Sequence, residues 1–319
     1  MELKFEILQK LNQAKGSVSG EEMAKEFGVS RSAIWKAVRT LKREGVAITA
    51  VQNCGYCLDG EEDLLDAKTI ESMVQFPCRV KVLSKTASTN DEIKRLAEAG
   101  GEEWCVVLAE EQTEGRGRYH RKFYSQRSKG VYLSILLRPT FSAQETLFIT
   151  TCAAVAVCEA IEKISGKNVT IKWVNDVLLG GKKVCGILTE SSYNVESGQV
   201  SYAVVGIGIN VIQQEFSKEL NEVATSIFTK GEYPQNGRSN IAAEVINRFR
   251  RYYEDIPSRS FYEEYKRRSF VLGREVSVVS GNLSGKAKVL DIDNDCCLRV
   301  KFENGDLKTI SSGEVSIKL

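Results

Sequence analysis

The sequence predicts an α+β protein of three domains, and three patterns support this fold class. Apolar residues recur at helical spacing early in the chain, residues 67–265 alternate strand-like and helical runs, and the last fifty residues hold short strand-like runs between turns. A length of 319 residues fits two or three domains of roughly 100–200 residues each. We expect a helical domain with a β wing over residues 1–62, a mixed β-sheet with helices over 63–269, and a small antiparallel β-barrel over 270–319.

Composition restricts the class of protein further. The formal net charge of +2 gives no overall bias toward nucleic acid or membrane, so any basic surface must be local. We expect a cytoplasmic protein without a membrane partner, because the sequence has neither a long apolar run nor a signal peptide. The nine cysteines lie mostly in apolar runs, as buried reduced thiols do. His120 is the only histidine, which argues against a Ser-His-Asp hydrolase or a histidine-rich metal site.

The first domain has the pattern of a winged helix-turn-helix. Ser19 and Glu22 form a capping-box pattern at the start of a second helix, and a turn at residues 28–30 leads into a third helix over 31–43. Residues 46–58 alternate enough to form a two-stranded wing that turns near residue 53. The third helix is strongly basic, which suits contacts with DNA phosphates, although a solvated basic face is the alternative. Its candidate DNA-binding residues are Arg31, Ser32, Trp35, Lys36 and Arg39.

A glycine-rich cationic loop over residues 111–125 is the most distinctive stretch of the chain. It joins two apolar runs, 104–109 and 131–137, that are typical of strands. Four cations fall within seven residues: Arg116, Arg118, Arg121 and Lys122. Arginine side chains match carboxylate or phosphate oxygens in pairs, and glycine lets a backbone approach a ligand closely. We interpret the loop as mobile when free and ordered by an anion, such as a nucleotide or acyl phosphate. A solvated basic loop or a nucleic-acid contact is the alternative.

Three other patterns mark candidate ligand contacts. Ser88, Thr89 and Asn90 precede a helix expected at 91–99, where they either cap it or hold a polar ligand head. Lys183 follows a hairpin turn near Asp176; a solvated lysine and a turn-capping aspartate are the alternatives to a shared cleft. Glycines 206 and 208 lie on one face of a strand, which suggests that a ligand or backbone passes over that face.

The remaining elements follow from apolar periodicity and turn residues. Helices are expected at residues 67–73, 144–164, 241–254 and 260–269. Strands are expected at 80–83, 169–173, 177–179, 182–190, 202–210, 275–279, 285–292, 296–302 and 306–310.

Several blocks of the chain together resemble one family, the biotin–protein ligases that carry a DNA-binding domain and act as bifunctional biotin ligase and biotin-operon repressor. Residues 115–118 are similar to the family's glycine-arginine loop, and 172–176 to its Lys-Trp-Pro-Asn-Asp signature. Residues 182–190 and 206–210 match two later blocks, and 312–316 match its C-terminal barrel. The resemblance implies a class II synthetase-like catalytic domain and an SH3-like C-terminal barrel.

The resemblance also implies a two-step reaction. ATP and Mg²⁺ activate biotin to biotinyl-5'-AMP, and a lysine of a biotin carboxyl carrier protein then accepts the biotin. Operator DNA and a homodimer formed with biotinyl-AMP are further implied partners. The implied catalytic residues are Arg116, Arg118, Lys183 and Asp176, with Asp176 also a weak metal candidate. The implied biotin contacts are Ser88, Thr89, Asn90, Gln112, Arg116, Gly117, Arg118, Lys183 and Gly186. The implied nucleotide contacts are Gly115, Arg118, Arg121, Lys172, Asn175 and Asn210.

The chain departs from the family pattern at three positions. Tyr119 and His120 stand where the family usually has arginine and glycine, and Val174 replaces a proline. Neither change in the loop removes Arg116 or Arg118, so we still expect an enzyme, while two alternative functions stay open. One is a ligand-sensing repressor without catalysis, and the other is a lipoate or octanoate ligase on the same scaffold.

Overall fold

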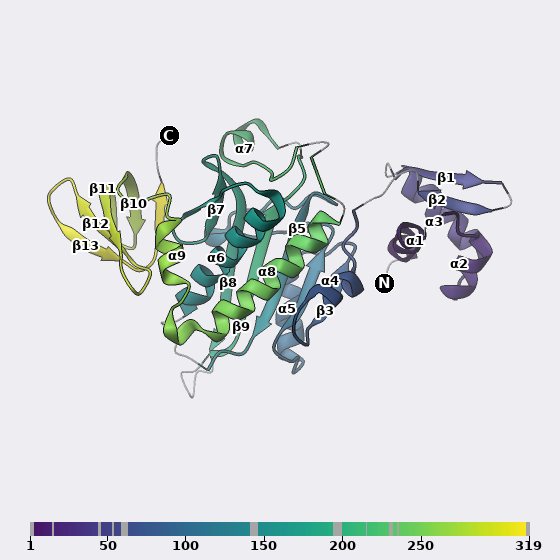
Figure 1. Ribbon diagram of the computed structural model, residues 1–319, viewed down its shortest axis with the longest axis horizontal. Coiled ribbons are helices and arrows are strands. Elements are labelled where there is room, and N and C mark those ends of the chain that lie inside the picture. The colour runs from purple at the N-terminus through teal and green to yellow at the C-terminus, as the bar shows by residue number, and fades with distance from the viewer. Residues whose placement is uncertain are drawn as a thin grey trace.

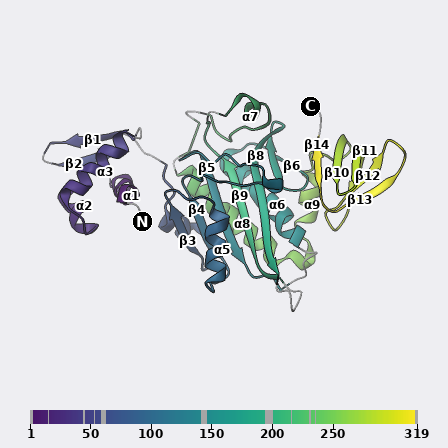
Figure 2. The same cartoon turned by 180° about the vertical axis from the view of Figure 1, so that it is seen from behind.

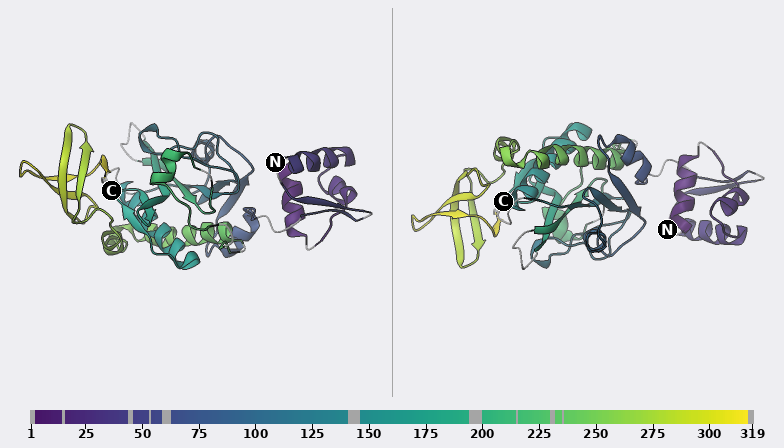
Figure 3. Two further views of the ribbon diagram at one scale, coloured as in Figure 1. Left: turned by 90° about the horizontal axis from the view of Figure 1, so that it is seen from above. Right: turned by 90° about the horizontal axis from the view of Figure 1, so that it is seen from below.

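The computed structural model has three parts in a row, with the N-terminal domain and the C-terminal sheet at opposite ends of the central domain (Figure 1; Figure 3). The structure describes residues 3–14, 16–43, 46–52, 54–58, 63–140, 146–193, 200–214, 216–229, 232–234 and 236–316. The predicted α+β class is confirmed. The boundary predicted after residue 62 falls beside residues 59–62, which lie outside the described part of the chain.

The N-terminal domain is the predicted helix-turn-helix with a hairpin. Its elements are α1 (Leu3–Gln13), α2 (Gly20–Glu26), α3 (Arg31–Arg43), β1 (Ile48–Val51) and β2 (Gly55–Leu58). Ser19 Oγ accepts a hydrogen bond from the Glu22 amide at 3.0 Å, and Ser30 Oγ accepts one from the Ala33 amide at 3.2 Å. The helix cap predicted at Ser19 is therefore present, and Ser30 caps α3 in the same way. The expected turn of the wing includes residue 53, which is outside the described residues.

The central domain is built on a seven-stranded mixed sheet with the order β3-β4-β5-β9-β8-β7-β6. The strands are β3 (Arg79–Leu83), β4 (Cys105–Ala109), β5 (Gly130–Leu137), β6 (Thr170–Lys172), β7 (Asp176–Leu179), β8 (Lys182–Tyr193) and β9 (Val200–Asn210). β3 and β4 are parallel, and the other neighbours are antiparallel. The antiparallel β5, β9 and β8 form the middle of the sheet, where the candidate ligand contacts gather.

Helices cover both faces of this sheet. The long helices α6 (Thr146–Ser165) and α8 (Gly237–Glu254) lie over one face (Figure 1), and α5 (Thr89–Glu98) lies over the other (Figure 2). The strands alternate accordingly: Val106 and Leu108 join the core under α6 and α8, whereas Val107 packs with Ile93 of α5. Shorter helices are α4 (Ala67–Met73), α7 (Lys218–Val223) and α9 (Tyr262–Arg267). Among the described helices, none has the length and apolar composition needed to cross a bilayer.

The C-terminal part is a five-stranded antiparallel sheet with the order β13-β12-β11-β10-β14. Its strands are β10 (Glu275–Ser280), β11 (Leu283–Ile292), β12 (Leu298–Phe302), β13 (Leu307–Ile310) and β14 (Glu314–Ser316). The antiparallel strands are confirmed, and β13 and β14 are the outer strands of the hydrogen-bonded order. Its buried side chains belong to the same apolar core as the central domain. Trp173 Nε1 also donates to Cys296 O at 2.8 Å, so the two parts are joined by packing and by a buried hydrogen bond.

Several element predictions differ in detail from the structure. Helix α5 begins at Thr89 rather than at residue 91, because residues 89 and 90 already have helical backbone. Helix α8 begins at Gly237, four residues before the predicted start, and α9 is shorter than the predicted 260–269. Strand β14 was not predicted, since three residues carry too little periodicity to identify a strand.

A buried ionic network ties the start of the central domain to its core. Arg238, at the beginning of α8, is fully buried, with Nη1 2.8 Å from Glu110 Oε2 and Nε 3.3 Å from Asp63 Oδ2. Glu110 Oε1 accepts from the Leu65 amide at 2.8 Å. Although burial opposes its charge, Glu110 and Asp63 hold the pKa of Arg238 above its usual value. The network therefore fixes the segment that follows the helix-turn-helix domain against the end of β4.

We expect Arg238→Leu to lower the free energy of unfolding by about 3–5 kcal/mol, because it leaves the Glu110 carboxylate buried without its cation. Denaturant unfolding followed by circular dichroism measures this change. Arg267→Leu is the matched control, since Arg267 is 64% exposed and pairs with Glu264 on the surface. That control should cost no more than about 1 kcal/mol. Equal effects of the two substitutions would contradict a structural role for the buried network.

Candidate ligand-binding site

One cavity of about 450 Å³ collects almost all of the predicted ligand contacts. Its walls come from the start of α5, the 111–125 loop, the β6–β8 region, β9 and the C-terminal sheet. The predicted residues that line it are Ser88, Thr89, Asn90, Gln112, Arg116, Gly117, Arg118, Arg121, Lys172, Asn175, Asp176, Lys183, Gly186 and Asn210. Gly115 is the exception. A Cβ at this position would lie 2.6 Å from Phe123 O and 2.8 Å from Ser125 Oγ, so residue 115 packs against the other strand of its hairpin.

A hydrogen-bonded group of polar side chains forms one end of the cavity. Gln112 Oε1 accepts from the Thr89 amide at 2.8 Å and from Thr89 Oγ1 at 3.0 Å, and Gln112 Nε2 donates to Ser125 Oγ at 2.9 Å. Ser88 occupies the N-cap position of α5, but its side chain makes no capping hydrogen bond. Ser88 is thus the N-cap residue by position only, and the ligand-holding interpretation of residues 88–90 stays a prediction.

The two glycines of β9 make room for side chains that cover the strand. A Cβ on Gly206 would overlap the side-chain amide of Asn90, and a Cβ on Gly208 would lie 2.5 Å from the Phe123 ring. We predicted that a ligand or backbone passes over this face; the neighbours in the structure are side chains rather than backbone, and the ligand contact stays a prediction. Phe123 was not predicted as a site residue. The glycine at position 208 was the signal that could have suggested it.

The cationic loop is a tight hairpin. Bridges pair Gln112 with Ser125 and Arg116 with Lys122, and the Gly117 amide donates to Arg121 O at 2.7 Å. Tyr119 and His120 form its tip with φ values of 56° and 58°, in the left-handed region that favours glycine. The departure at position 120 therefore places a side chain where glycine fits with less strain.

Each arginine of the hairpin has a hydrogen-bond or ion-pair partner elsewhere in the protein. These partners reduce the repulsion expected among four cations in so short a loop. Arg116 pairs with Asp91 of α5. Arg118 Nη1 donates to Asn175 Oδ1 at 3.3 Å, and its Nη2 donates to Gly313 O at 3.0 Å. Arg121 Nη2 donates to Glu314 Oε2 at 2.7 Å, and this carboxylate holds the pKa of Arg121 above its usual value. The loop is thereby attached to both α5 and the C-terminal sheet.

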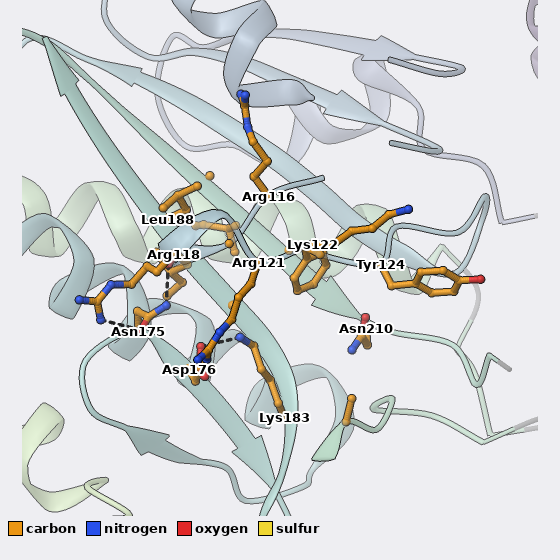
Figure 4. A pocket seen from close by; sticks show the side chains of 18 of the residues that line it. Arg116, Arg118, Arg121, Lys122, Tyr124, Asn175, Asp176, Lys183, Leu188 and Asn210 are labelled. Atoms are coloured by element: carbon orange, nitrogen blue, oxygen red, sulfur yellow. Dashed lines mark hydrogen bonds and ion pairs between the residues drawn. The ribbon is translucent and has the colours of Figure 1, made fainter. Parts of the chain in front are cut away.

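Lys183 and Asp176 face each other across the β7–β8 hairpin, with Nζ 2.7 Å from Oδ1 (Figure 4). The predicted shared cleft is present, since both side chains line the cavity. Around them, the described residues contain no group of three or more histidine, cysteine or acidic side chains able to hold a metal. Asp176 can contribute at most one carboxylate to an ion carried in by a ligand.

The predicted DNA-binding residues lie together on the outer face of α3. Trp35, Lys36 and Arg39 are exposed, whereas Ile34, Val38 and Leu41 are buried on the opposite face. The Arg39 guanidinium lies 5.2 Å from the centre of the Trp35 ring, which is half exposed. An apolar ring stacked by a cation at the centre of a basic helix face is suited to the groove and backbone of DNA.

Comparisons with known proteins agree with this organisation. Residues 4–57 match the model of the HTH domain, residues 81–210 the Biotin/lipoate A/B protein ligase family, and residues 271–318 the Biotin protein ligase C terminal domain. The chain is 32% identical over 328 residues to the Bifunctional ligase/repressor BirA of Bacillus subtilis (strain 168), covering 99% of this chain and 98% of that protein. It is 28% identical to the protein of the same name from Escherichia coli (strain K12), covering 94% of this chain and 92% of that one.

A solved structure gives the same result. The biotin protein ligase from Aquifex aeolicus in complex with biotin and ATP is 30% identical, with a TM-score of 0.63 over 76% of this chain and 98% of that chain. The fold and the site thus define a ligase-type catalytic domain between a helix-turn-helix domain and a small C-terminal sheet. The chain belongs to the biotin protein ligase family, and within it to the bifunctional ligase/repressors.

We expect Gly208→Ala to disturb the hairpin, because the added methyl group must displace the Phe123 ring. The expected cost is about 1–3 kcal/mol, with faster amide hydrogen exchange at residues 116–122. Gly117→Ala is the control, since its Cβ would meet Arg121 O at an ordinary 3.5 Å. If Gly208→Ala leaves exchange in the hairpin unchanged, Phe123 does not hold the loop in place.

Proposed function

We propose that this protein is a biotin–protein ligase that converts biotin and ATP to biotinyl-5'-AMP and pyrophosphate, and then transfers biotin to a lysine of a carrier protein. One observation carries the proposal: a single cavity has neutral hydrogen-bonding side chains at one end and the cations Arg118 and Lys183 elsewhere in its wall. A ligand with a polar uncharged ring, an apolar body and a carboxylate suits such a lining. The cavity supports placing the ring at Thr89 and Gln112.

The first step joins two anions. The carboxylate of biotin attacks the α-phosphate of ATP, a P–O bond to pyrophosphate breaks, and an acyl phosphate anhydride forms. Arg118 and Lys183 can neutralise the carboxylate and the α-phosphate, and fixed charges aimed at developing charge are usually the largest catalytic contribution. Their present partners, Asn175 and Asp176, are close enough to hold both cations in position before the ligand enters.

The remaining nucleotide assignments are also proposals. Lys172, Asn175 and Asn210 line the same cavity and offer donors to phosphate and sugar oxygens. The Mg²⁺ ion would be bound mainly by triphosphate oxygens, with Asp176 as the one carboxylate expected to reach it, and it would supply positive charge beside the phosphates. Arg121 is available to the phosphates when it exchanges its contact with Glu314.

In the second step a carrier lysine attacks the acyl carbon of the adenylate. An amide bond forms, AMP leaves with the electron pair of the broken acyl–oxygen bond, and the lysine loses a proton. We propose a biotin carboxyl carrier protein as the acceptor, on the basis of family membership. The cytoplasmic location stays a prediction.

We further propose that the α3 face binds operator DNA and that a homodimer forms with biotinyl-AMP bound. A helix-turn-helix of this kind reads DNA most effectively as a pair, because two recognition helices then reach successive major grooves. The helix-turn-helix match and the bifunctional relatives support the repressor role. The dimer rests on the sequence resemblance and on this geometric requirement.

The two alternative functions make different predictions. A repressor that only senses a ligand would bind biotin without releasing pyrophosphate from ATP. A lipoate or octanoate ligase would have little use for a buried polar group at the end of the cavity, because those acids carry no N–H donor. The Thr89–Gln112 hydrogen bonds therefore favour biotin over lipoate.

We expect Lys183→Met to slow biotin-dependent pyrophosphate release about 10²–10³-fold, the usual cost of losing one transition-state charge contact. Lys182→Met is the matched control, because Lys182 points to Asn221 O at 2.6 Å instead of to Asp176. Arg118→Ala should either slow the same step or let the adenylate escape into solution. Unchanged release and retention in both variants would remove these residues from the mechanism.

We expect the triple substitution Arg31→Ala, Lys36→Ala and Arg39→Ala to weaken binding to operator DNA and to flatten its salt dependence. Each lost phosphate contact should reduce the slope of log affinity against log salt by roughly 0.9. Fluorescence anisotropy across a salt series measures the slope. Lys288→Ala in the C-terminal sheet is the control, and its slope should match that of the unmodified protein. An unaltered slope in the triple variant would make the N-terminal domain a protein-interaction module instead.

A further inference from the structure

The side-chain amide of Asn90 is held on three sides. It lies over Gly206 of β9, where any Cβ would overlap it, and Asn90 itself is only 5% exposed. Its Nδ2 donates to Glu190 Oε2 at 2.6 Å, and its Oδ1 accepts from Ser134 Oγ at 2.6 Å. Neither Glu190 nor Ser134 was identified from the sequence. Ser134 is fully buried in the apolar strand β5, where it lies opposite Gly206.

Glu190 determines which way this amide points. An ionised carboxylate can only accept hydrogen bonds, so the Asn90 atom that faces it must be the nitrogen. Lys94 Nζ lies 2.7 Å from the other carboxylate oxygen, Glu190 Oε1. Although partial burial opposes its charge, hydrogen bonds from Lys94 and Asn90 hold the pKa of Glu190 below its usual value. Glu190 is therefore ionised at neutral pH, and Asn90 Oδ1 faces Ser134.

With the amide in this orientation, the oxygen–oxygen contacts around Ser134 outnumber the hydrogens available to form hydrogen bonds. Ser134 Oγ lies 2.7 Å from Thr89 Oγ1 and 2.6 Å from Asn90 Oδ1, and Thr89 Oγ1 lies 3.0 Å from Gln112 Oε1. These three contacts share only the two hydroxyl hydrogens of Ser134 and Thr89. Whichever arrangement forms, one oxygen of Thr89, Asn90 or Gln112 keeps an unused lone pair. All three of these residues line the cavity.

We propose that Glu190 is a positioning residue that, through Asn90, keeps this end of the cavity an acceptor site selective for a ring N–H donor. If the Asn90 amide were reversed, its nitrogen would supply the missing hydrogen to Ser134, and the site would no longer need one from the ligand. Glu190 forbids that reversal, because it would bring two acceptors together at 2.6 Å. The inference rests on the proposed function, in which the ureido ring of biotin supplies the N–H groups.

Binding of two ligands by calorimetry tests the proposal at pH 8. One ligand is biotin, and the other is its cyclic carbonate analogue, in which oxygen replaces both ring N–H groups. Glu190→Gln can donate to Asn90 Oδ1 and so permits the reversed amide. It should weaken biotin about tenfold to hundredfold and leave the carbonate within about twofold, which reduces the preference for biotin. Glu190→Ala, which removes the acceptor altogether, should give the same loss of preference.

Lys94→Met is the matched control, because it removes the other partner of Glu190 while leaving the carboxylate to face Asn90. It should keep the preference for biotin within about threefold of the unmodified protein. Thermal unfolding and ATP affinity, both expected to stay unchanged, show that the cavity is intact. Glu190 variants that retain the full preference, or that lose both ligands equally, would overturn the proposal. Failure of the unmodified protein to bind biotin would instead overturn the proposed function, and this inference with it.

Discussion

The packing of side chains onto the bare backbone of β9 is the constraint on which the rest of the site depends. Asn90 and Phe123 come from different segments, yet both occupy space that exists only because positions 206 and 208 lack a Cβ. Asn90 brings the start of α5 to the sheet, and Phe123 brings the cationic hairpin. One face of one strand therefore sets the distance between the polar end of the cavity and its cations. Such close packing leaves little freedom to adjust, so the lining is largely preorganised.

Compensation of charge by the protein is the second feature that organises the site. Three arginines and Lys183 surround a cavity, and Asp91, Glu314 and Asp176 each pair with one of these cations. An anionic ligand that binds Arg116, Arg121 or Lys183 would exchange with these carboxylates, whereas Arg118 has only the neutral partners Asn175 and Gly313 O. Because Glu314 belongs to the C-terminal sheet, the same contact joins that sheet to the hairpin that closes the cavity. A nucleotide that bound Arg121 would therefore break the ion pair between Arg121 and Glu314, and so remove one contact of the C-terminal sheet with the hairpin.

Most of the fold could be predicted from local patterns. The helix caps at Ser19 and Ser30, the apolar alternation of the strands and the glycine turns are local signals, and the structure confirms them. The candidate site was also largely visible, because its loops have an unusual density of glycine and arginine. The residues that pair with these site residues could not be identified from the sequence. Glu190, Ser134 and Glu314 carry no local signal, since their importance comes from contacts between positions that are about 40–190 residues apart. The contact predicted for Gly115 stays a prediction, because this residue does not line the cavity.

Transfer of labelled biotin to a purified biotin carboxyl carrier domain would show whether this protein completes both steps of the ligase reaction. The assay uses the complete chain, with ATP and magnesium, and omits each component in turn. We expect label on the carrier lysine only when ATP and magnesium are both present with the labelled biotin, and AMP and pyrophosphate should be released in equal amounts. Tight biotin binding without transfer or pyrophosphate release would contradict it, and would identify the protein as a ligand-sensing repressor built on a ligase fold.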